Sequence, residues 1–323
     1  SYYYGAGTER NDVYIAKVDL ATGKLLAPPA LASQRFEGTN SRPDWSPDGR
    51  QLIFLSLRGS GPWGSKAFCV RSMESGEVRE LAPKLDTVSW VRWSPDGRSL
   101  LTDGRTGQGL EPVEGYGLFR IDVQTGEFKR IAALGPNYPA IWSGDGKAVL
   151  RWSWGDPGKK DSSIAALNVA TGQEQVLYPL PGSSIWGGPL ALSRDGRQLA
   201  FVLTDAVRTQ ERVLKVVPSE GGEARDVLRG VPIGRDIVWT PDGQTLLFTM
   251  REPDGSRRRL WSVPVQGGEP RKLELAADGM TDVCMHPDGR HIAFTAVQSR
   301  NEIWVLENFL PAPKAPKQSP RAA

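Results

Sequence analysis

The sequence predicts an all-β protein, namely a β-propeller of four-stranded antiparallel blades. A hexapeptide turn recurs every 46 to 50 residues, and a second turn recurs out of phase with it. The 323 residues include 36 Gly and 25 Pro, which separate many short apolar segments. Many short strands at an even spacing, with turn residues between them, are typical of propellers.

The first turn has the chemistry of a tight β-hairpin. Its six copies begin at Trp45 (WSPDGR), Trp93 (WSPDGR), Trp142 (WSGDGK), Leu192 (LSRDGR), Trp239 (WTPDGQ) and Met285 (MHPDGR). Ser or Thr can accept local N–H groups, Pro presets φ, and Gly takes the left-handed conformation that closes a three-residue hairpin with a bulge. We therefore expect positive φ at Gly49, Gly97, Gly196, Gly243 and Gly289.

The second turn divides each repeat into four strands, A to D. Its copies begin at Asp19 (DLATGK), Ser72 (SMESGE), Asp122 (DVQTGE), Asn168 (NVATGQ), Pro218 (PSEGGE) and Pro264 (PVQGGE). The hexapeptide then joins strands A and B, and the second turn joins strands C and D. Because one blade cannot bury both faces alone, blades pack against each other around an axis. We expect the Trp at the start of the hexapeptide to pack between blades at Trp45, Trp93, Trp142 and Trp239.

The number of blades follows from the two ends of the chain. Segment 1–15 aligns with segment 291–305, with Arg10-Asn11 on Arg300-Asn301, so both resemble strand B, a loop and strand C. This alignment favours seven blades with incomplete first and last blades and an open strand edge that upstream residues would complete. Six blades are the alternative. The predicted boundaries are 1–36 (partial), 37–83, 84–133, 134–180, 181–230, 231–276 and 277–309 (partial), followed by a Pro-rich disordered tail at 310–323.

The WSPDGR hexapeptide followed by a TGE turn resembles the repeats of TolB-like, or WD-like, bacterial β-propellers. The resemblance extends to about Phe309. It implies the propeller fold but not one function, since such propellers occur in the periplasmic TolB protein, beside kinases and winged-helix regulators, and as the gating domain of prolyl-oligopeptidase-type enzymes. The sequence itself does not specify a compartment, and the resemblance favours the periplasm or another extracytoplasmic location.

Motifs for catalysis and metal binding are missing from the sequence. It contains no GxSxG, HExxH or phosphate-binding GxxxxGK[ST] segment. The only two histidines, His286 and His291, lie in and just after the last hexapeptide, and Asp288 there is a turn residue. We therefore predict no catalytic residue, no metal and no cofactor, and a protein that is not an enzyme.

Charge and composition exclude several partners. The net charge is +3, which does not favour nucleic acid, and we interpret the run 257–259 (Arg-Arg-Arg) as a solvated loop. No apolar segment is long enough for a membrane span. Cys69 and Cys284 are expected to be buried structural thiols. The chain is expected to be monomeric unless its open edge pairs with another chain.

The variable B–C and D–A loops share one face and are where binding is usually carried on a rigid scaffold. Three tryptophans outside the hexapeptide fall in these loops, at Trp63, Trp154 and Trp186. Exposed Trp with Arg is typical of protein-binding hot spots. The alternative is that each Trp folds back over its own loop.

Strand A is expected to line the central channel. Its charged residues are Arg42, Asp44, Arg92, Arg235, Asp236 and Asp282. They could orient a polar ligand or peptide, or they could compensate one another in a water-filled channel. We predict a binding surface on the loop face formed by Arg42, Trp63, Arg92, Trp154, Trp186 and Arg235.

Three functions are compatible with these features. The first is a non-catalytic scaffold that binds a protein or peptide on the face of the B–C and D–A loops. The alternative is a sensory or regulatory domain of a larger bacterial signalling protein, such as a kinase or winged-helix regulator. The third is a propeller enzyme or gating domain, which would need convergent acid and base residues.

Overall fold

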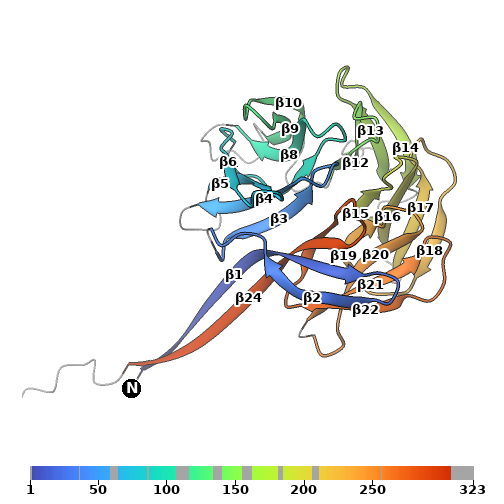
Figure 1. The fold of residues 1–323 in the computed structure, drawn as a ribbon. Coiled ribbons are helices and arrows are strands. Elements are labelled where there is room, and N and C mark those ends of the chain that lie inside the picture. The colour runs from blue at the N-terminus through green and yellow to red at the C-terminus, as the bar shows by residue number, and fades with distance from the viewer. Residues whose placement is uncertain are drawn as a thin grey trace, which may run out of the picture.

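The structure, a computed structural model, describes residues 2–306 except 36, 59–64, 86, 107–115, 134–139, 155–161, 181–184, 206–210 and 256. The described residues form six four-stranded antiparallel sheets arranged around a common axis (Figure 1). Five sheets consist of four consecutive strands each, whereas the sixth combines strands from both ends of the chain.

The blades are numbered along the chain, and their strands are given from A to D. Blade 1 contains β3 (Asn40–Trp45), β4 (Gln51–Arg58), β5 (Ser65–Ser72) and β6 (Val78–Leu81). Blade 2 contains β7 (Val91–Trp93), β8 (Ser99–Arg105), β9 (Tyr116–Asp122) and β10 (Phe128–Ala133). Blade 3 contains β11 (Ala140–Trp142), β12 (Ala148–Trp154), β13 (Ser162–Asn168) and β14 (Glu174–Leu180).

The second half of the ring repeats the same arrangement. Blade 4 contains β15 (Ile185–Leu192), β16 (Gln198–Asp205), β17 (Arg212–Pro218) and β18 (Arg225–Arg229). Blade 5 contains β19 (Ile233–Trp239), β20 (Thr245–Arg251), β21 (Arg258–Pro264) and β22 (Arg271–Ala277). Blade 6 takes its strands from both chain ends: β23 (Thr281–Met285), β24 (His291–Leu306), β1 (Tyr2–Asp19) and β2 (Lys24–Leu31).

Blade 6 closes the ring, and it corrects the predicted number of blades. The structure has six blades in its described residues, so the seven-blade interpretation is wrong and the six-blade alternative is correct. The two end segments are not two copies of a strand–loop–strand unit. They are single long strands that pair antiparallel from Lys17 with His291 to Tyr2 with Leu306. The expected open edge is therefore filled by the chain's own first two strands.

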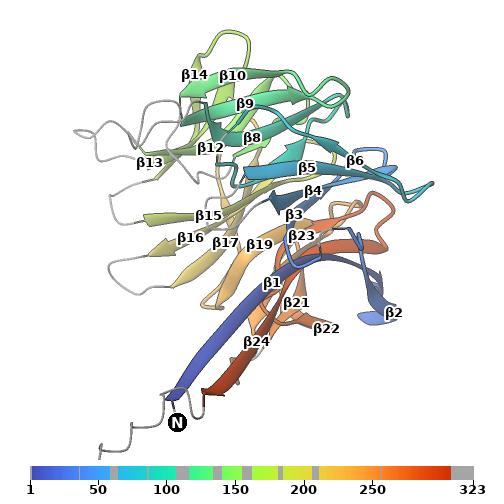
Figure 2. The same cartoon turned by 90° about the vertical axis from the view of Figure 1, so that its left-hand side faces the viewer.

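The pairing of β1 with β24 continues beyond the blade as a two-stranded ribbon. Figures 1 and 2 show this ribbon projecting from the ring, with the N-terminus near its tip. Its base is fixed to the start of blade 1 and to the segment that precedes it. The N–H of Asn11 donates to the carbonyl of Gly38, and the Asp12 carboxylate accepts the N–H of Gly38 and the side-chain N–H of Asn40 in β3. Strands B and C meet at the loop face, so the ribbon replaces the B–C loop of blade 6.

The hexapeptides form the expected hairpin turns. The five glycines predicted at positive φ all have it, with values between 67° and 73° at Gly49, Gly97, Gly196, Gly243 and Gly289. In blade 1 the Ser46 hydroxyl donates to Asp48 at 2.6 Å and accepts the N–H of Gln51 at 2.9 Å. These contacts explain why the Ser and Asp of the motif recur together.

A valine at a turn glycine is expected to strain the backbone. We expect Gly97→Val to lower the free energy of unfolding by about 1 kcal/mol or more, because a β-branched side chain disfavours a φ of 68°. A Cβ atom at this position would meet only Pro47, at an ordinary distance of 3.7 Å. The loss of stability would therefore come from backbone strain and not from a steric clash with a neighbouring residue. Chemical denaturation measures this change, and equal stability of the two proteins would contradict it.

The tryptophans of the hexapeptide pack between blades, as predicted. All four are buried: Trp45, Trp93, Trp142 and Trp239. The indole N–H of Trp93 donates to the carbonyl of Asp44 in blade 1, and that of Trp239 donates to the carbonyl of Ala191 in blade 4. Each of these two bonds joins a blade to the one before it, so burial and hydrogen bonding together hold neighbouring blades in place.

In the described part of the chain, no helix has the length and apolar character needed to cross a membrane. Both cysteines are free thiols: Cys69 is buried and Cys284 is partly buried beside the axis. The predicted disordered tail at 310–323 lies outside the described residues.

Candidate functional site

Three neighbouring blades place a charged residue at the same position of strand A. Asp236 in blade 5, Asp282 in blade 6 and Arg42 in blade 1 each stand three residues before the first residue of a hexapeptide. Because strand A is the innermost strand, these side chains come together near the axis. With Lys66 of β5 they form a group that we call the Arg42 cluster.

The centre of the cluster is an ion pair between two strained residues. The Arg42 guanidinium donates through Nη1 to Oδ1 of Asp282, and the backbone N–H of Arg42 donates to the Thr295 hydroxyl at 3.1 Å. Arg42 has a φ of 59° and Asp282 a φ of 55°, which are uncommon for residues other than glycine. Backbone strain of this kind occurs preferentially at functional sites, where the surrounding structure maintains it.

The second carboxyl group of the cluster, that of Asp236, has a raised pKa. Asp236 is buried, and it accepts the Thr249 hydroxyl at 3.1 Å and the N–H of Val283 at 3.3 Å. Burial, and after it the negative charge of Asp282, raise the pKa of Asp236 to about 6. This carboxyl group therefore changes charge close to neutral pH, which is unusual for an aspartate.

Lys66 adds a second cation from another strand. Its ammonium group donates to the carbonyl of Val88 at 2.6 Å. Burial, and after it the positive charge of Arg42, lower the pKa of Lys66, whereas Asp103 and Asp282 oppose this effect. The lysine thus belongs to the same electrostatic environment as the ion pair, although it lies near the start of strand C of blade 1.

Exposure within the cluster determines what it can bind. The side chain of Arg42 is 44% exposed, whereas that of Asp282 is 8% exposed. A guanidinium has five N–H donors, and within the described residues the side chain of Arg42 uses one of them. Asp282 therefore fixes the orientation of Arg42 while leaving donors directed to solvent. Such an arrangement is suited to a carboxylate or another anion.

The opposite end of the axis contains a separate cavity of about 560 Å³. It is lined by the last strand-A residues and the hexapeptide turns of all six blades. Asp44 and Arg92 supply its charge at adjacent positions, and Asp44 accepts the N–H of Trp93 at 2.7 Å. Burial raises the pKa of Asp44, while Arg92 opposes this effect. This turn-face cavity does not include Arg42 among its lining residues.

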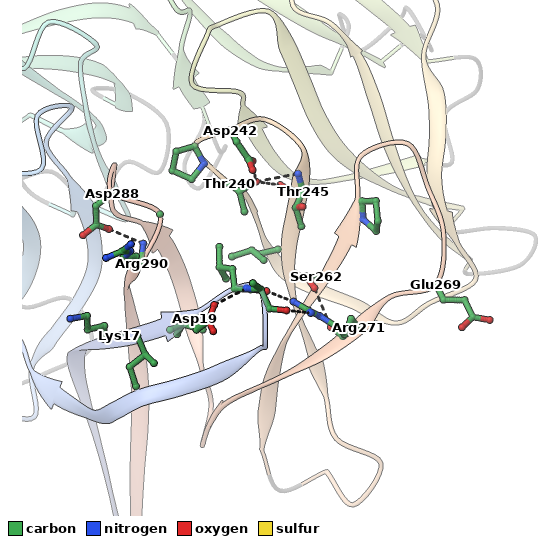
Figure 3. Close-up of a pocket in the computed structure, with 18 residues that line it drawn as sticks. Lys17, Asp19, Thr240, Asp242, Thr245, Ser262, Glu269, Arg271, Asp288 and Arg290 are labelled. Carbon is green, nitrogen blue, oxygen red and sulfur yellow. Dashed lines mark hydrogen bonds between the residues drawn. The ribbon is translucent and has the colours of Figure 1, made fainter.

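Two larger hollows lie between neighbouring blades. One, of about 1010 Å³, separates blade 5 from the β1–β2 hairpin of blade 6, and Figure 3 shows Arg271 crossing it. Arg271 donates to the carbonyls of Leu20 and Ala21 at the hairpin tip. The other, of about 1070 Å³, lies in the same position between blades 3 and 4. Since the groove recurs, we attribute it to blade geometry and not to a particular ligand.

The predicted binding residues are distributed over several places. Arg42 lies in the cluster, the exposed Arg235 precedes Asp236 in β19, and Arg92 lines the turn-face cavity. Trp63 lies outside the described residues. The backbones of Trp154 and Trp186 lie at the end of β12 and the start of β15, toward the loop face, and their side chains are outside the described set.

Lys66 and the backbone strain were not identified from the sequence. Nothing in the sequence indicates that a strand-C lysine lies near the strand-A carboxylates, and Lys66 is therefore not among the predicted site residues. The positive φ values of Arg42 and Asp282 accompany register shifts in β3 and β23, which no turn motif announces. The sequence signal for the cluster was a charged residue three positions before the first, fifth and sixth hexapeptides.

Neither of the two cysteines is an activated nucleophile. Burial raises the pKa of the Cys69 thiol, and burial, then Asp44, raise that of Cys284 well above its usual value. Neither thiol is therefore a thiolate near neutral pH, and a thiolate is the reactive form. The cluster thus offers binding groups and one carboxyl that titrates near neutrality.

Sequence comparison finds a relative that matches about half of this chain. No protein-family model matches the chain. A curated relative, "Uncharacterized peptidase YuxL" of Bacillus subtilis (strain 168), is 30% identical over 165 residues, which are 51% of this chain and 22% of that protein. The chain thus aligns with about a fifth of this relative's length.

Solved structures give a broader match. A putative TolB from Agrobacterium tumefaciens aligns with a TM-score of 0.66 and 18% identity, over 90% of this chain and 99% of that chain. The tricorn protease aligns with a TM-score of 0.57 and 16% identity, over 79% of this chain and 24% of that chain. The chain therefore has a TolB-like β-propeller fold, as the hexapeptide indicated.

These findings overturn two functional expectations. The interpretation as a non-catalytic scaffold, together with the prediction that the protein is not an enzyme, is contradicted by a relative that is named as a peptidase. The proteases among the solved structures share the propeller fold with this chain at 16% identity. The sequence misled on this point because the hexapeptide repeat specifies only the blade and is shared by propellers of both kinds.

Proposed function

We propose that this chain is the propeller of a peptidase-class enzyme and that its Arg42 cluster binds a carboxylate of the peptide substrate. The observation that carries this proposal is an exposed guanidinium, oriented by the buried carboxylate of Asp282 at the axis of the ring. The similarity to a named peptidase supplies the reaction class. The likeness to TolB gives coarse support for a protein or peptide as the partner.

The arrangement would supply selectivity as well as affinity. A guanidinium held by one bond keeps a fixed direction, so a carboxylate can pair with it without first ordering a free side chain. The neighbouring Arg235 is exposed and adds positive charge on the same strand as Asp236. A peptide with a free carboxyl terminus, or with an acidic side chain, fits these groups better than a neutral one.

Peptide affinity measured by fluorescence anisotropy tests the proposal. We expect Arg42→Ala to weaken binding of an N-terminally labelled acidic peptide by roughly tenfold, which is about 1.4 kcal/mol. Arg92→Ala is the matched control, because it removes an arginine from the turn-face cavity of the same channel. Mass spectrometry of the incubated peptide follows hydrolysis in parallel. Equal losses in the two variants, or no peptide binding by the unaltered chain, would contradict the proposal.

A further inference from the structure

Blade 6 differs from the other blades at two positions of its hexapeptide turn. The position that is Ser or Thr in the other five blades is His286 here. Five residues later, where blades 1 and 4 have Gln51 and Gln198, blade 6 has His291. These are the only two histidines in the sequence, and they flank the turn residue Asp288.

The fold brings the three side chains together. His286 Nδ1 lies 3.0 Å from Oδ1 of Asp288, and His291 Nδ1 lies 2.6 Å from Oδ2 of the same carboxylate. One ligand atom from each residue can be chosen so that all three atoms lie within 4.8 Å of one another. All three side chains are partly exposed, so solvent can reach them.

The tautomer of His286 is fixed by a contact across the ring closure. Its Nε2 donates to the carbonyl of Gly49 in blade 1 at 3.0 Å, which leaves the lone pair on Nδ1. That lone pair accepts the N–H of Asp288 at 3.0 Å and faces the carboxylate. Imidazole ligands of metals commonly donate their other N–H to a backbone carbonyl in this way. The ring also packs edge-on against Trp45 at 4.6 Å between centroids.

We propose that His286, Asp288 and His291 form a binding site for a first-row divalent cation, with Zn²⁺ as the preferred ion. Two imidazole nitrogens and one carboxylate oxygen are ligands that zinc accepts, and a fourth position would remain for water. Coordination replaces the bond from the Asp288 N–H to Nδ1. The site lies on the turn face, where Asp288 also borders the groove of Figure 3, and it is separate from the Arg42 cluster.

The cation would also strengthen the closure of the ring. His286 belongs to blade 6, and the carbonyl that holds it belongs to blade 1, so a bound ion restrains the contact between the first and last blades. A ligand that binds only the folded state raises the melting temperature. The site therefore predicts a Zn²⁺-dependent rise in thermal stability as well as direct binding.

Titration calorimetry with Zn²⁺ alone, on chelator-treated full chain, tests this proposal. We expect one saturable site, with affinity lowered at least about tenfold by His286→Ser and by His291→Gln. Both substitutions restore residues found in other blades, so the fold should persist, and circular dichroism checks this. Asp288→Asn should weaken binding, whereas the matched Asp48→Asn in blade 1 should not. Binding that survives His286→Ser, or no saturable binding below about 1 mM, overturns the proposal.

Discussion

Phe294→Ala is expected to lower the free energy of unfolding by about 3–5 kcal/mol. Phe294 is fully buried in β24 and packs against Tyr14 of β1, with 5.8 Å between ring centroids. Its removal leaves a cavity in the one sheet that joins the two ends of the chain. Since whole domains are stabilised by about 5–15 kcal/mol, this loss is a large share of the total.

The same strand supplies the control for this prediction. Val305 lies in the ribbon part of β24 and is 45% exposed. We expect Val305→Ala to change stability by less than about 0.5 kcal/mol, as for other exposed positions. Urea denaturation of both variants measures the difference. Similar stabilities for Phe294→Ala and the unaltered protein would mean that blade 6 is not closed by β1 and β24.

Asp236→Asn is expected to remove a pH dependence of stability. The folded-state pKa of Asp236, about 6, exceeds the usual value of 3.8, so the folded state binds more protons between these values. The stability of the unaltered protein relative to the variant therefore falls as the pH rises from about 4 to about 7. The total change is on the order of 3 kcal/mol, because each unit of pKa corresponds to about 1.36 kcal/mol.

Denaturation at several pH values measures this difference. The control is Asp48→Asn, because the Ser46 hydroxyl and the N–H of Arg50 lower the pKa of Asp48. A carboxyl group with a lowered pKa stabilises the folded state at pH values above its usual pKa, and this stabilisation is lost as the pH falls. The control should therefore show the opposite sign. A flat difference for Asp236→Asn would show that burial and Asp282 do not affect this carboxyl group.

The residues of the two turns were sufficient to predict the four-stranded blade, but not the number of blades or how the ring closes. The glycine conformations and the inter-blade tryptophans follow from short segments, and the structure confirms both. The pairing of β1 with β24 joins residues that lie 274 (Lys17 and His291) to 304 (Tyr2 and Leu306) positions apart, and no local pattern encodes it. The six hexapeptides and six second turns would have indicated six blades. The sequence alignment of segment 1–15 with segment 291–305 suggested a seventh blade instead.

The candidate site was only partly predictable for a similar reason. Arg42, Asp236 and Asp282 were recognisable as charged strand-A residues because strand A faces the axis. The orientation of Arg42 depends on strained backbone and on a partner in another blade, which only the closed ring brings together. His286 and His291 were visible in the sequence, but Asp288 was interpreted as a turn residue alone. The structure shows that it contacts both imidazoles.

The most direct test of the proposed function is a double-mutant cycle between Arg42 and the peptide carboxylate. Affinities are measured for one peptide with a free carboxyl terminus and for its amide, each with the unaltered chain and with Arg42→Ala. If Arg42 binds the terminal carboxylate, amidation weakens binding to the unaltered chain by roughly tenfold and has little effect on the variant. Equal effects of amidation on both proteins would contradict a contact between Arg42 and the terminal carboxylate.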